Sequence, residues 1–357
     1  MSSTFGKNIK VSIFGESHGE AIGCVIDGLP HGVELDMEQI KKEMKRRAPG
    51  QDKSATPRKE ADEPKILSGV LNGKTTGAPL AMMIENTNTR SGDYSNVMTV
   101  PRPSHSDYPA YIKYGGDNDI RGGGHFSGRL TAPLVFAGAV AKQILAKKGV
   151  CIGSHIKKIG PAEDECFDKN SISPEFLKSL SNDLFATISN EKELEMRTVI
   201  ETARLEGNSV GGIIECAAVG VPAGIGGNMF ETVESRLSYA LFGIPAVKGV
   251  EFGAGFGFAD MTGYKANDAY EIKNGGVALK TNNNGGVLGG ITTGAPIVFS
   301  VAIKPTPSIS IAQESVNLET MQNETLVVRG RHDPCIVPRA LPVVEGVCAL
   351  VLLDLMM

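Results

Sequence analysis

The length, composition and charge of the chain exclude several classes of protein. Its 357 residues include 43 glycines and 19 prolines, yet 41% are hydrophobic, so we expect a folded chain with much of its backbone in turns rather than a disordered one. A formal net charge of −4, the absence of tryptophan and an aromatic content of 6% argue against a nucleic-acid partner.

The cysteines and the apolar segments indicate the compartment. The six cysteines contain no CxxC pair, so we predict neither a metal site nor a thiol–disulfide motif. The N-terminus runs into a strand-like segment, Asn8–Phe14, and not into a cleavable signal. The longest apolar stretch, Ala340–Met357, carries Glu345 and Asp354 and is too short to span a bilayer. We therefore expect a soluble, cytoplasmic protein with no membrane partner.

Hydrophobic periodicity predicts alternating strands and helices along the chain. Thr131–Lys147 and Ala340–Leu355 are largely apolar, which is typical of buried helices. Two long connectors rich in glycine and asparagine, Gly115–Gly124 and Asn274–Gly290, are expected to be binding loops. The other predicted elements, in chain order, are strands at Asn8–Phe14 and Gly23–Ile26, helices at Met37–Arg47 and Ser171–Asp183, a polar surface region at Asn190–Glu193, strands at Thr198–Leu205, Gly211–Glu215 and Ile213–Val219, and a helix at Phe230–Leu241.

Two short motifs occur twice in the same order. TTGAPL at Thr75–Leu80 recurs as TTGAPI at Thr292–Ile297, and GLPHG at Gly28–Gly32 has a counterpart, GVPAG, at Gly220–Gly224. Each GxPxG motif follows a strand pattern and precedes a helix pattern. Chance matches in glycine-rich sequence are the alternative, but the shared order and context favour an internal duplication.

The repeat predicts an α+β fold with an internally duplicated, pseudo-symmetric core. Its two similar halves, roughly 8–150 and 198–357, are expected to pack as a single domain, 1–357. Two other glycine motifs do not alter this prediction. Gly69–Thr75 is one residue short of a Walker A loop, and Gly253–Gly257 lacks the GxGxxG spacing of a dinucleotide fold.

Two polar segments of the first half are candidates for a ligand site. His18 lies among small residues after the first strand, where either a ligand contact or a surface position is possible. The segment Lys41–Lys59 contains eight basic and two acidic residues. Its lysines before residue 46 fit a solvated helix face, whereas Arg47, Lys53 and Arg58 fall on the following loop, where they suit a small anionic ligand.

Two further segments combine arginine, histidine and small residues. Arg102 lies between two prolines, and His105 follows with Asp107 placed to orient it. The glycine-rich segment Arg121–Arg129 precedes a helix, which favours an anion site.

A last pair of basic loops lies near the C-terminus, at Lys304–Ser308 and Arg329–Cys335. Asp333 in the second loop is either a site residue or a helix N-cap, with Pro334 at the first helical position. Together the four segments indicate acid–base chemistry on a polyanionic small molecule.

At these residues the sequence resembles the chorismate synthase family. The motifs are GESHG at Gly15–Gly19 running to DGLP at Asp27–Pro30, the glycine-rich loop Gly124–Arg129, and RHDPC at Arg331–Cys335. Arg102–Tyr108, Pro245–Glu251 and the Lys304 loop are also similar, so the resemblance covers essentially the whole chain.

The resemblance implies a β-α-β sandwich and an anti-1,4-elimination of phosphate from 5-enolpyruvylshikimate-3-phosphate, which gives chorismate. It further implies reduced FMN as cofactor, NADPH only indirectly for flavin reduction, an external flavin reductase or other source of reduced flavin, and a homotetramer. A non-catalytic flavin- or phosphate-binding protein on the same scaffold is the alternative, and the joint presence of His18, His105 and Asp333 favours the enzyme.

The resemblance also implies roles for single residues. His18 would protonate the departing phosphate, His105 would protonate or poise the reduced flavin, and Asp333 would help to accept and pass on the substrate proton at flavin N5. Ser17 and Ser127 would support them. The implied anion-binding residues are Arg47, Lys53, Arg58, Arg102, Arg129 and Arg331. The implied FMN contacts are His125, Phe126, Ser127, Pro245, Ala246, Gly289, Lys304, Pro305, Thr306, Pro307, Ser308 and Arg331.

The chain departs from the family's pattern at two places. His125-Phe126 stands where Arg-Ser is common, and Lys53 stands where Arg is common, which keeps the charge but loses bidentate geometry.

Overall fold

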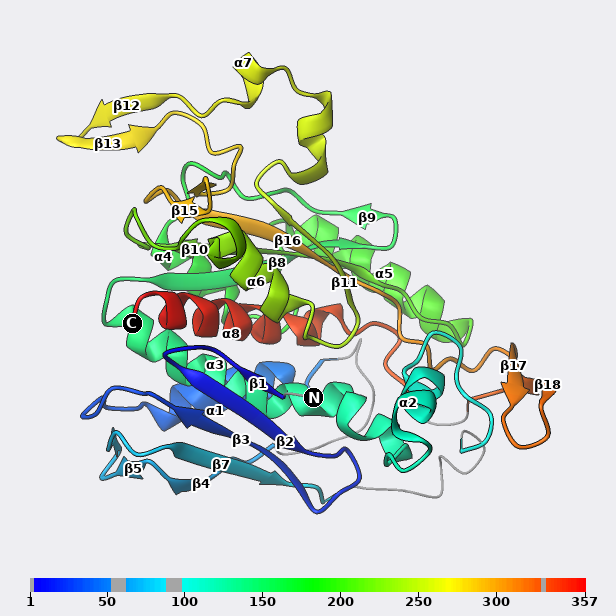
Figure 1. Ribbon diagram of the computed structural model, residues 1–357. Helices are drawn as coiled ribbons and strands as arrows, with labels where there is room; N and C mark the ends of the chain where they lie inside the picture. Colours follow the sequence, from blue (N-terminus) through cyan, green and yellow to red (C-terminus); the bar gives the residue numbers. More distant parts are fainter. Residues whose placement is uncertain (1–2, 53–61, 88–97, 329–331) are drawn as a thin grey trace.

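Two antiparallel sheets enclose a layer of helices (Figure 1). The computed structural model describes residues 3–52, 62–87, 98–328 and 332–357. The first sheet has the order β1-β2-β3-β7-β4, formed by Thr4–Phe5, Lys10–Gly15, Ala21–Asp27, Leu80–Glu85 and Lys65–Ser68. The second has the order β11-β16-β10-β8-β9, formed by Val247–Phe252, Ile297–Ile303, Gly212–Val219, Cys151–Ile159 and Ala162–Glu163. This is the β-α-β sandwich that the family resemblance implies.

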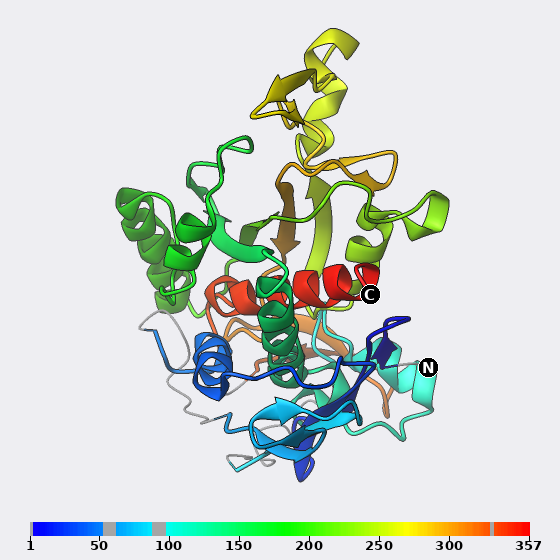
Figure 2. The ribbon, with the colours of Figure 1, turned by 90° about the vertical axis from the view of Figure 1, so that its left-hand side faces the viewer.

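Four helices lie between the sheets, and two cover the outer face of the second sheet (Figure 2). The inner helices are α1 (Met37–Arg47), α3 (Thr131–Ala146), α6 (Val233–Leu241) and α8 (Val337–Leu355). The outer helices are α4 (Pro174–Leu180) and α5 (Asn190–Leu205). All four inner helices match the predicted segments to within a few residues. No helix within the described ranges is long and apolar enough to cross a membrane.

The shorter elements are connections around this frame. The helices are α2 (Asp107–Tyr114), α7 (Gly263–Ala266) and the 3₁₀ turns η2 (Arg121–Phe126), η3 (Gly128–Leu130), η4 (Met229–Glu231) and η5 (Gly255–Asp260). The strand pairs are β5–β6 (Val70–Leu71, Lys74–Thr75), β12–β13 (Tyr270–Lys273, Gly276–Leu279), β14–β15 (Val287–Leu288, Ile291–Thr292) and β17–β18 (Gln313–Asn317, Gln322–Leu326). The hairpin β12–β13 and α7 project from the body in both views (Figures 1 and 2).

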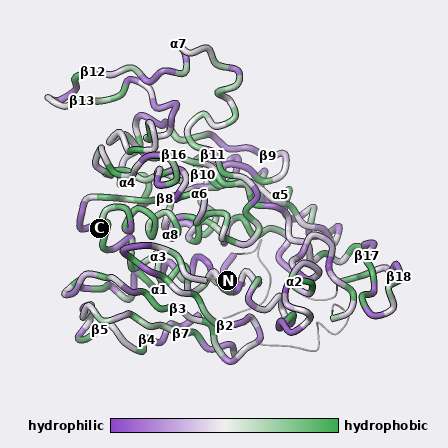
Figure 3. The backbone as a smooth tube through the Cα atoms, in the orientation of Figure 1, coloured by the Kyte–Doolittle hydropathy of each residue, from purple (hydrophilic) through white to green (hydrophobic). Residues whose placement is uncertain are grey.

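The central helices α3 and α8 are largely hydrophobic (Figure 3). They approach closely because Gly138 faces Gly346: a Cβ atom built on Gly138 would lie 2.2 Å from the Cα atom of Gly346. Only glycine permits this contact between two backbones. The crossing of α3 and α8 joins the two halves of the chain.

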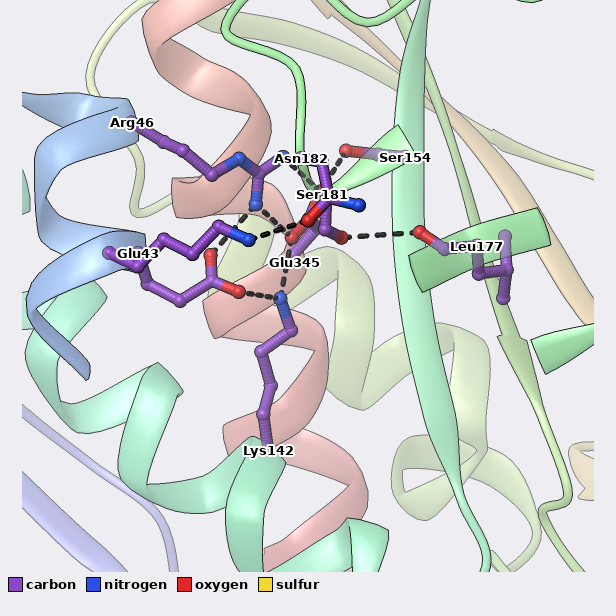
Figure 4. A network of polar contacts seen from close by, with 9 residues as sticks. Glu43, Arg46, Lys142, Ser154, Leu177, Ser181, Asn182 and Glu345 are labelled. Atoms are coloured by element: carbon purple, nitrogen blue, oxygen red, sulfur yellow. Dashed lines mark hydrogen bonds and ion pairs between the residues drawn. The ribbon is translucent and has the colours of Figure 1, made fainter. Parts of the chain in front are cut away.

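A buried ionic network surrounds Glu345 of α8 at this junction (Figure 4). Arg46 of α1 donates to both carboxylate oxygens, at 2.8 and 2.9 Å, and Lys142 of α3 lies at 2.6 Å. Ser154 of β8 adds a hydrogen bond of 2.7 Å, and Glu43 contacts both cations. Burial alone would raise the pKa of Glu345, but Arg46 and Lys142 outweigh it and hold the pKa below its usual value.

The two halves repeat the same contacts at the duplicated motifs. The Thr75 hydroxyl donates to the Pro30 carbonyl at 2.6 Å and accepts from the Val33 N–H at 2.9 Å. In the second half the same two bonds measure 2.7 and 2.9 Å, and the residues that form them are Thr292, Pro222 and Ile225. Strand orders also correspond, β2-β3-β7-β4 with β8-β10-β16-β11. Because β8 lies before residue 198, the second repeat begins earlier than the sequence analysis placed it.

The prediction of a strand at Thr198–Leu205 was wrong. These residues form the C-terminal half of α5, and the polar segment before them forms its first turn. Four β-branched side chains suggested a strand. The buried residues Met196, Ile200 and Ala203 are instead four and three positions apart, which is the spacing of one helix face. Packing of this face overrides the weak strand preference.

Candidate functional site

A cavity of about 850 Å³ opens between the two halves. Four segments form most of its lining: the C-terminal end of α1 with the loop after it, the loop that leads into α3, the loop after α6, and the connection from β16 to α8 with the first turns of α8. Ser17, after β2, and Ser104–Ser106, before α2, complete the lining. The first and third segments are equivalent in the repeat, as are the second and fourth. The cavity therefore lies where corresponding loops of the two halves face each other.

Three glycines bring two predicted histidines together on the first-half side. Gly122, Gly123 and Gly124 have φ angles of 60°, 86° and 53°, which favour glycine. A Cβ atom on Gly122 would lie 2.6 Å from the His18 ring and 2.8 Å from the Ser17 hydroxyl, and one on Gly123 would lie 3.3 Å from the His105 ring. The glycine turn therefore packs against all three side chains. Ser17 and His105 line the cavity, whereas His18 is buried against Gly122, outside the lining and not at the surface.

His105 is held by a buried ion pair. Its Nδ1 atom lies 2.5 Å from Asp107 Oδ1, and the other oxygen of Asp107 accepts from Arg102 Nε at 2.7 Å. Burial alone would raise the pKa of Asp107, but Arg102 and His105 hold it well below its usual value. The Arg102 side chain is 4% exposed and does not line the cavity. Arg102, predicted to bind substrate, here donates to both oxygens of Asp107, and its Nη2 also lies 3.1 Å from His105 Nδ1. It therefore supports His105 both directly and through Asp107.

Arg47 and Arg129 form a cationic wall, and both line the cavity. Asp62 lies between them: Arg47 Nη1 donates to one carboxylate oxygen at 2.8 Å, and Arg129 Nη1 donates to the other. Burial alone would raise the pKa of Asp62, but the two arginines hold it below its usual value. The sequence analysis missed Asp62, because neither of its partners is a neighbour in sequence.

Asp333 lines the cavity and is not a helix N-cap, because α8 begins at Val337 with Ile336 as its cap. Arg339, in the first turn of α8, donates to the Asp333 carboxylate from Nη1 and to the Arg47 carbonyl from Nε at 2.9 Å. Sequence analysis also missed Arg339. A cation in the first turn of a helix opposes the helix dipole, and this signal could have marked it.

The second half contributes an apolar wall with two lysines. Phe242–Val247 follows α6 and lines the cavity, and Ala246 has a φ angle of 73°, a strained value for a residue other than glycine. Lys248 and Lys304 lie beside it, and Lys304 Nζ donates to the Ser104 carbonyl. Burial, together with the charge of Lys248, lowers the pKa of Lys304.

The other predicted cofactor residues divide into two groups. Those that line the cavity are His125, Phe126, Ser127, Pro245, Ala246, Lys304, Thr306 and Pro307. Those outside its lining are Gly289, in the turn between β14 and β15, Pro305, and Ser308, whose hydroxyl accepts from Arg102. Lys53, Arg58 and Arg331 lie outside the described residues.

The two departures from the family pattern have structural partners. Both ring nitrogens of His125 are engaged, Nδ1 with the Gly15 carbonyl at 2.7 Å and Nε2 with the Ser3 hydroxyl at 2.8 Å. The Phe126 ring packs edge-on against Tyr114, with centroids 6.1 Å apart. His125 thus joins the glycine-rich loop to the end of β2.

Comparison with known proteins identifies this arrangement. A sequence profile described as "Chorismate synthase" matches residues 9–357. The chain belongs to the chorismate synthase family. It is 51% identical over 350 residues to chorismate synthase of Thermococcus kodakarensis, covering 98% of this chain and 96% of that protein. It is 48% identical over 365 residues to that of Lancefieldella parvula, covering 99% and 96%.

A solved structure agrees with the family at the level of the fold. A crystal structure of chorismate synthase matches with a TM-score of 0.77 and 30% sequence identity, covering 99% of this chain and 92% of that one. The family consists of lyases of the shikimate pathway that act on a small molecule and use reduced FMN. The chain is therefore an enzyme of this family, and the alternative of a non-catalytic binding protein is not favoured.

Proposed function

We propose that the cavity between the halves carries out the elimination of phosphate from 5-enolpyruvylshikimate-3-phosphate to give chorismate. The observation that supports this most strongly is the division of the cavity into two walls. Arginines and histidines of the first half line one part of the cavity, and an apolar segment flanked by lysines, together with Asp333 and Arg339, lines the other. A substrate with one phosphate and two carboxylates matches the first wall, because a guanidinium group can donate two parallel hydrogen bonds to a phosphate or carboxylate group.

The apolar wall fits the flavin ring of reduced FMN. Its residues, Phe242–Val247 with Ile336, Ala340 and Val343 of α8, offer a surface for a flat ring, and Lys248 and Lys304 offer charges for its phosphate. A volume of about 850 Å³ lies near the top of the range of small-molecule sites, which leaves room for flavin and substrate together. The chemistry that bound reduced FMN supplies is transient electron donation to the substrate, which leaves the overall reaction redox-neutral.

The residues of the chain would handle protons and charge. His18, against the glycine turn and beside Ser17, would donate a proton to the departing phosphate. His105 would act from the flavin side with its ring fixed by Asp107. Asp333, held by Arg339, would pass on the proton removed from the substrate. In each case a second polar group sets the orientation before the ligand arrives.

An anaerobic assay with photoreduced FMN and the enolpyruvyl substrate tests this function. Chorismate and phosphate should form in equal amounts and only with reduced flavin. His18→Ala should lower kcat by about 10²- to 10⁴-fold, the usual contribution of a general acid. His31→Ala is the matched control, since His31 is exposed and lies beside Gly77 of the TTGAP motif, away from the glycine turn that packs on His18. Phosphate release without flavin, or an unchanged His18→Ala enzyme, would contradict the proposal.

We also propose that reduced flavin comes from an external reductase, with NADPH acting only there, and that the enzyme works in the cytoplasm. The structure of two glycine motifs that resemble nucleotide-binding motifs supports the proposal of an external reductase. Gly69–Thr75 forms the β5–β6 hairpin, and Gly253–Gly257 leads into the 3₁₀ turn η5. Neither forms the strand–turn–helix of a P-loop or dinucleotide site.

We propose a homotetramer as well, because the projecting segment around α7 and β12–β13 exposes large apolar side chains. Phe256 and Tyr264 are 87% and 95% exposed, and Ile272 is 76% exposed. Such surfaces are typical of contacts between chains. Native mass spectrometry should give four copies per particle, and Tyr264→Glu with Ile272→Glu should reduce that number. A monomeric wild-type protein would contradict it.

A further inference from the structure

Asp62 occupies an unusual position beside the cationic wall. Its side chain is 1% exposed, and each of its two oxygens accepts from a different arginine, Arg47 and Arg129. Its φ angle is 48°, in the left-handed region that aspartate and asparagine tolerate better than most residues. One carboxylate thus bridges two cations that both line the cavity.

Further contacts on the protein side fix the orientation of the two arginines. Arg47 Nε donates to Thr131 Oγ1 at 3.0 Å, and its Nη2 donates to the Gly128 carbonyl, also at 3.0 Å. Arg129 Nε donates to Asn86 Oδ1 at 3.2 Å. Each guanidinium plane is therefore set by at least two partners. Thr131 is the first residue of α3, Gly128 belongs to the 3₁₀ turn η3 and Asn86 follows β7, so three different elements hold the two groups.

Charge explains why a carboxylate is needed between them. Two guanidinium groups side by side repel each other, and taking both out of water costs free energy unless an anion compensates one of them. Asp62 compensates part of this charge and fixes the separation of the two guanidinium groups. An anion in the cavity then meets two oriented donors that do not have to reorganise.

We propose that Asp62 is a positioning residue that holds Arg47 and Arg129 as a prepared pair for one anionic group of the substrate. This inference rests on the proposed function, since it assigns the pair to the substrate. It gives Asp62 a role in substrate affinity, without contact between Asp62 and the reacting atoms.

Asp62→Asn is the sharpest test. Asparagine tolerates the same backbone conformation, but its amide group has one oxygen, so one arginine would meet an N–H group in place of an acceptor. We expect KM to rise about 10- to 100-fold, the worth of a charge-assisted hydrogen bond, while kcat changes less than about threefold. Calorimetric titration of the substrate should show the same loss of affinity.

The direction in which KM changes distinguishes a positioning role of Asp62 from a role in charge balance alone. Asp62→Asn makes the wall more positive, so a purely electrostatic role predicts tighter substrate binding and a lower KM. A lower or unchanged KM would overturn the proposal, and so would a fall in kcat of about 10- to 100-fold without a change in KM. Asp52→Asn is the matched control, because Asp52 forms a comparable two-bond pair with Arg197, at 2.9 and 3.0 Å, outside this cavity. It should leave KM unchanged.

A second variant covers the case in which Asp62→Asn does not fold. Thr131→Val keeps the shape of the side chain and removes the acceptor for Arg47 Nε, so KM should rise by a smaller factor, about 3- to 10-fold for one hydrogen bond. An unchanged KM in Thr131→Val would overturn the proposal in that case. Absence of turnover in the wild-type enzyme with reduced FMN would instead contradict the proposed function, whatever the variants bind.

Discussion

The two halves of the molecule share a frame and differ in what they carry on it. The threonine–proline bonds at Thr75 and Thr292 match to within 0.1 Å. The connections do not match: a short turn with His18 joins β2 to β3, whereas β9, α4 and α5 lie between β8 and β10. α1 ends in Arg47, while α6 ends in Leu241 and leads into the apolar wall. A duplicated scaffold can therefore build one asymmetric site, because strand and helix contacts tolerate free variation in the loops.

The largest expected effect concerns the junction of the halves. Glu345→Ala would leave Arg46 and Lys142 buried without their main partner, so we expect the free energy of unfolding to fall by about 3–5 kcal/mol. Urea denaturation measures this value. Glu201→Ala, which removes an exposed helix pair with Arg204, is the control and should change stability little. Equal stability of the two variants would show that the network does not join the halves.

The next effect compares two glycines with positive φ angles, Gly122 in the turn beside His18 and Gly224 in the repeated GVPAG motif. Gly122→Ala and Gly224→Ala both place a side chain at a positive φ, 60° and 94°. Only the first new methyl group meets other atoms, those of His18 and Ser17. We expect kcat/KM of Gly122→Ala to fall about 100-fold, as for a displacement near 1 Å, and that of Gly224→Ala to be unaffected. Similar losses in both would mean that backbone strain, and not the position of His18, controls activity.

A smaller effect tests the equivalence of the repeats. Thr75→Val and Thr292→Val each remove a buried hydroxyl that bonds two backbone groups. Each should lower the free energy of unfolding by about 1–3 kcal/mol, and the two values should agree closely. Chemical denaturation of both variants measures them. If one variant loses several times more than the other, the two contacts are not energetically equivalent.

The smallest effect is a pH dependence confined to the second sheet. His155 of β8 is buried between Glu215, at 3.0 Å, and Asp164, at 3.5 Å. Burial alone would lower its pKa, but the two carboxylates raise it above the usual value. The proton is therefore bound more tightly in the folded state. Its stabilising contribution is complete below pH of about 6.5, the unfolded pKa, and is lost as pH rises through the higher folded pKa.

The slope from one such proton is at most about 1.4 kcal/mol per pH unit. The strands of the first sheet contain no histidine in the described part of the chain, so it has no counterpart. Thermal midpoints of the wild type and His155→Gln between pH 6 and 9 should converge as pH rises. Parallel curves would show that His155 does not titrate in this range.

Local patterns in the sequence were sufficient for the long elements. The apolar faces of α1, α3 and α8 and the repeated GxPxG and TTGAP motifs depend on contacts between residues close in sequence or on periodic spacing. The same kind of reasoning failed at Thr198–Leu205, where β-branched side chains lie on a helix that packs against the second sheet. Intrinsic preference is weak there, and burial of one face decides.

The sequence by itself determined the repeat, the buried central helices and the residue types that bind anions and transfer protons. Only the tertiary structure decided which of those residues meet. Arg102 supports His105 directly and through Asp107, while Asp62 and Arg339 join the site through Arg47. The physical reason is that ion pairs and close glycine contacts form between residues that are far apart in sequence, so their partners are fixed by the packing of the two halves and not by spacing along the chain.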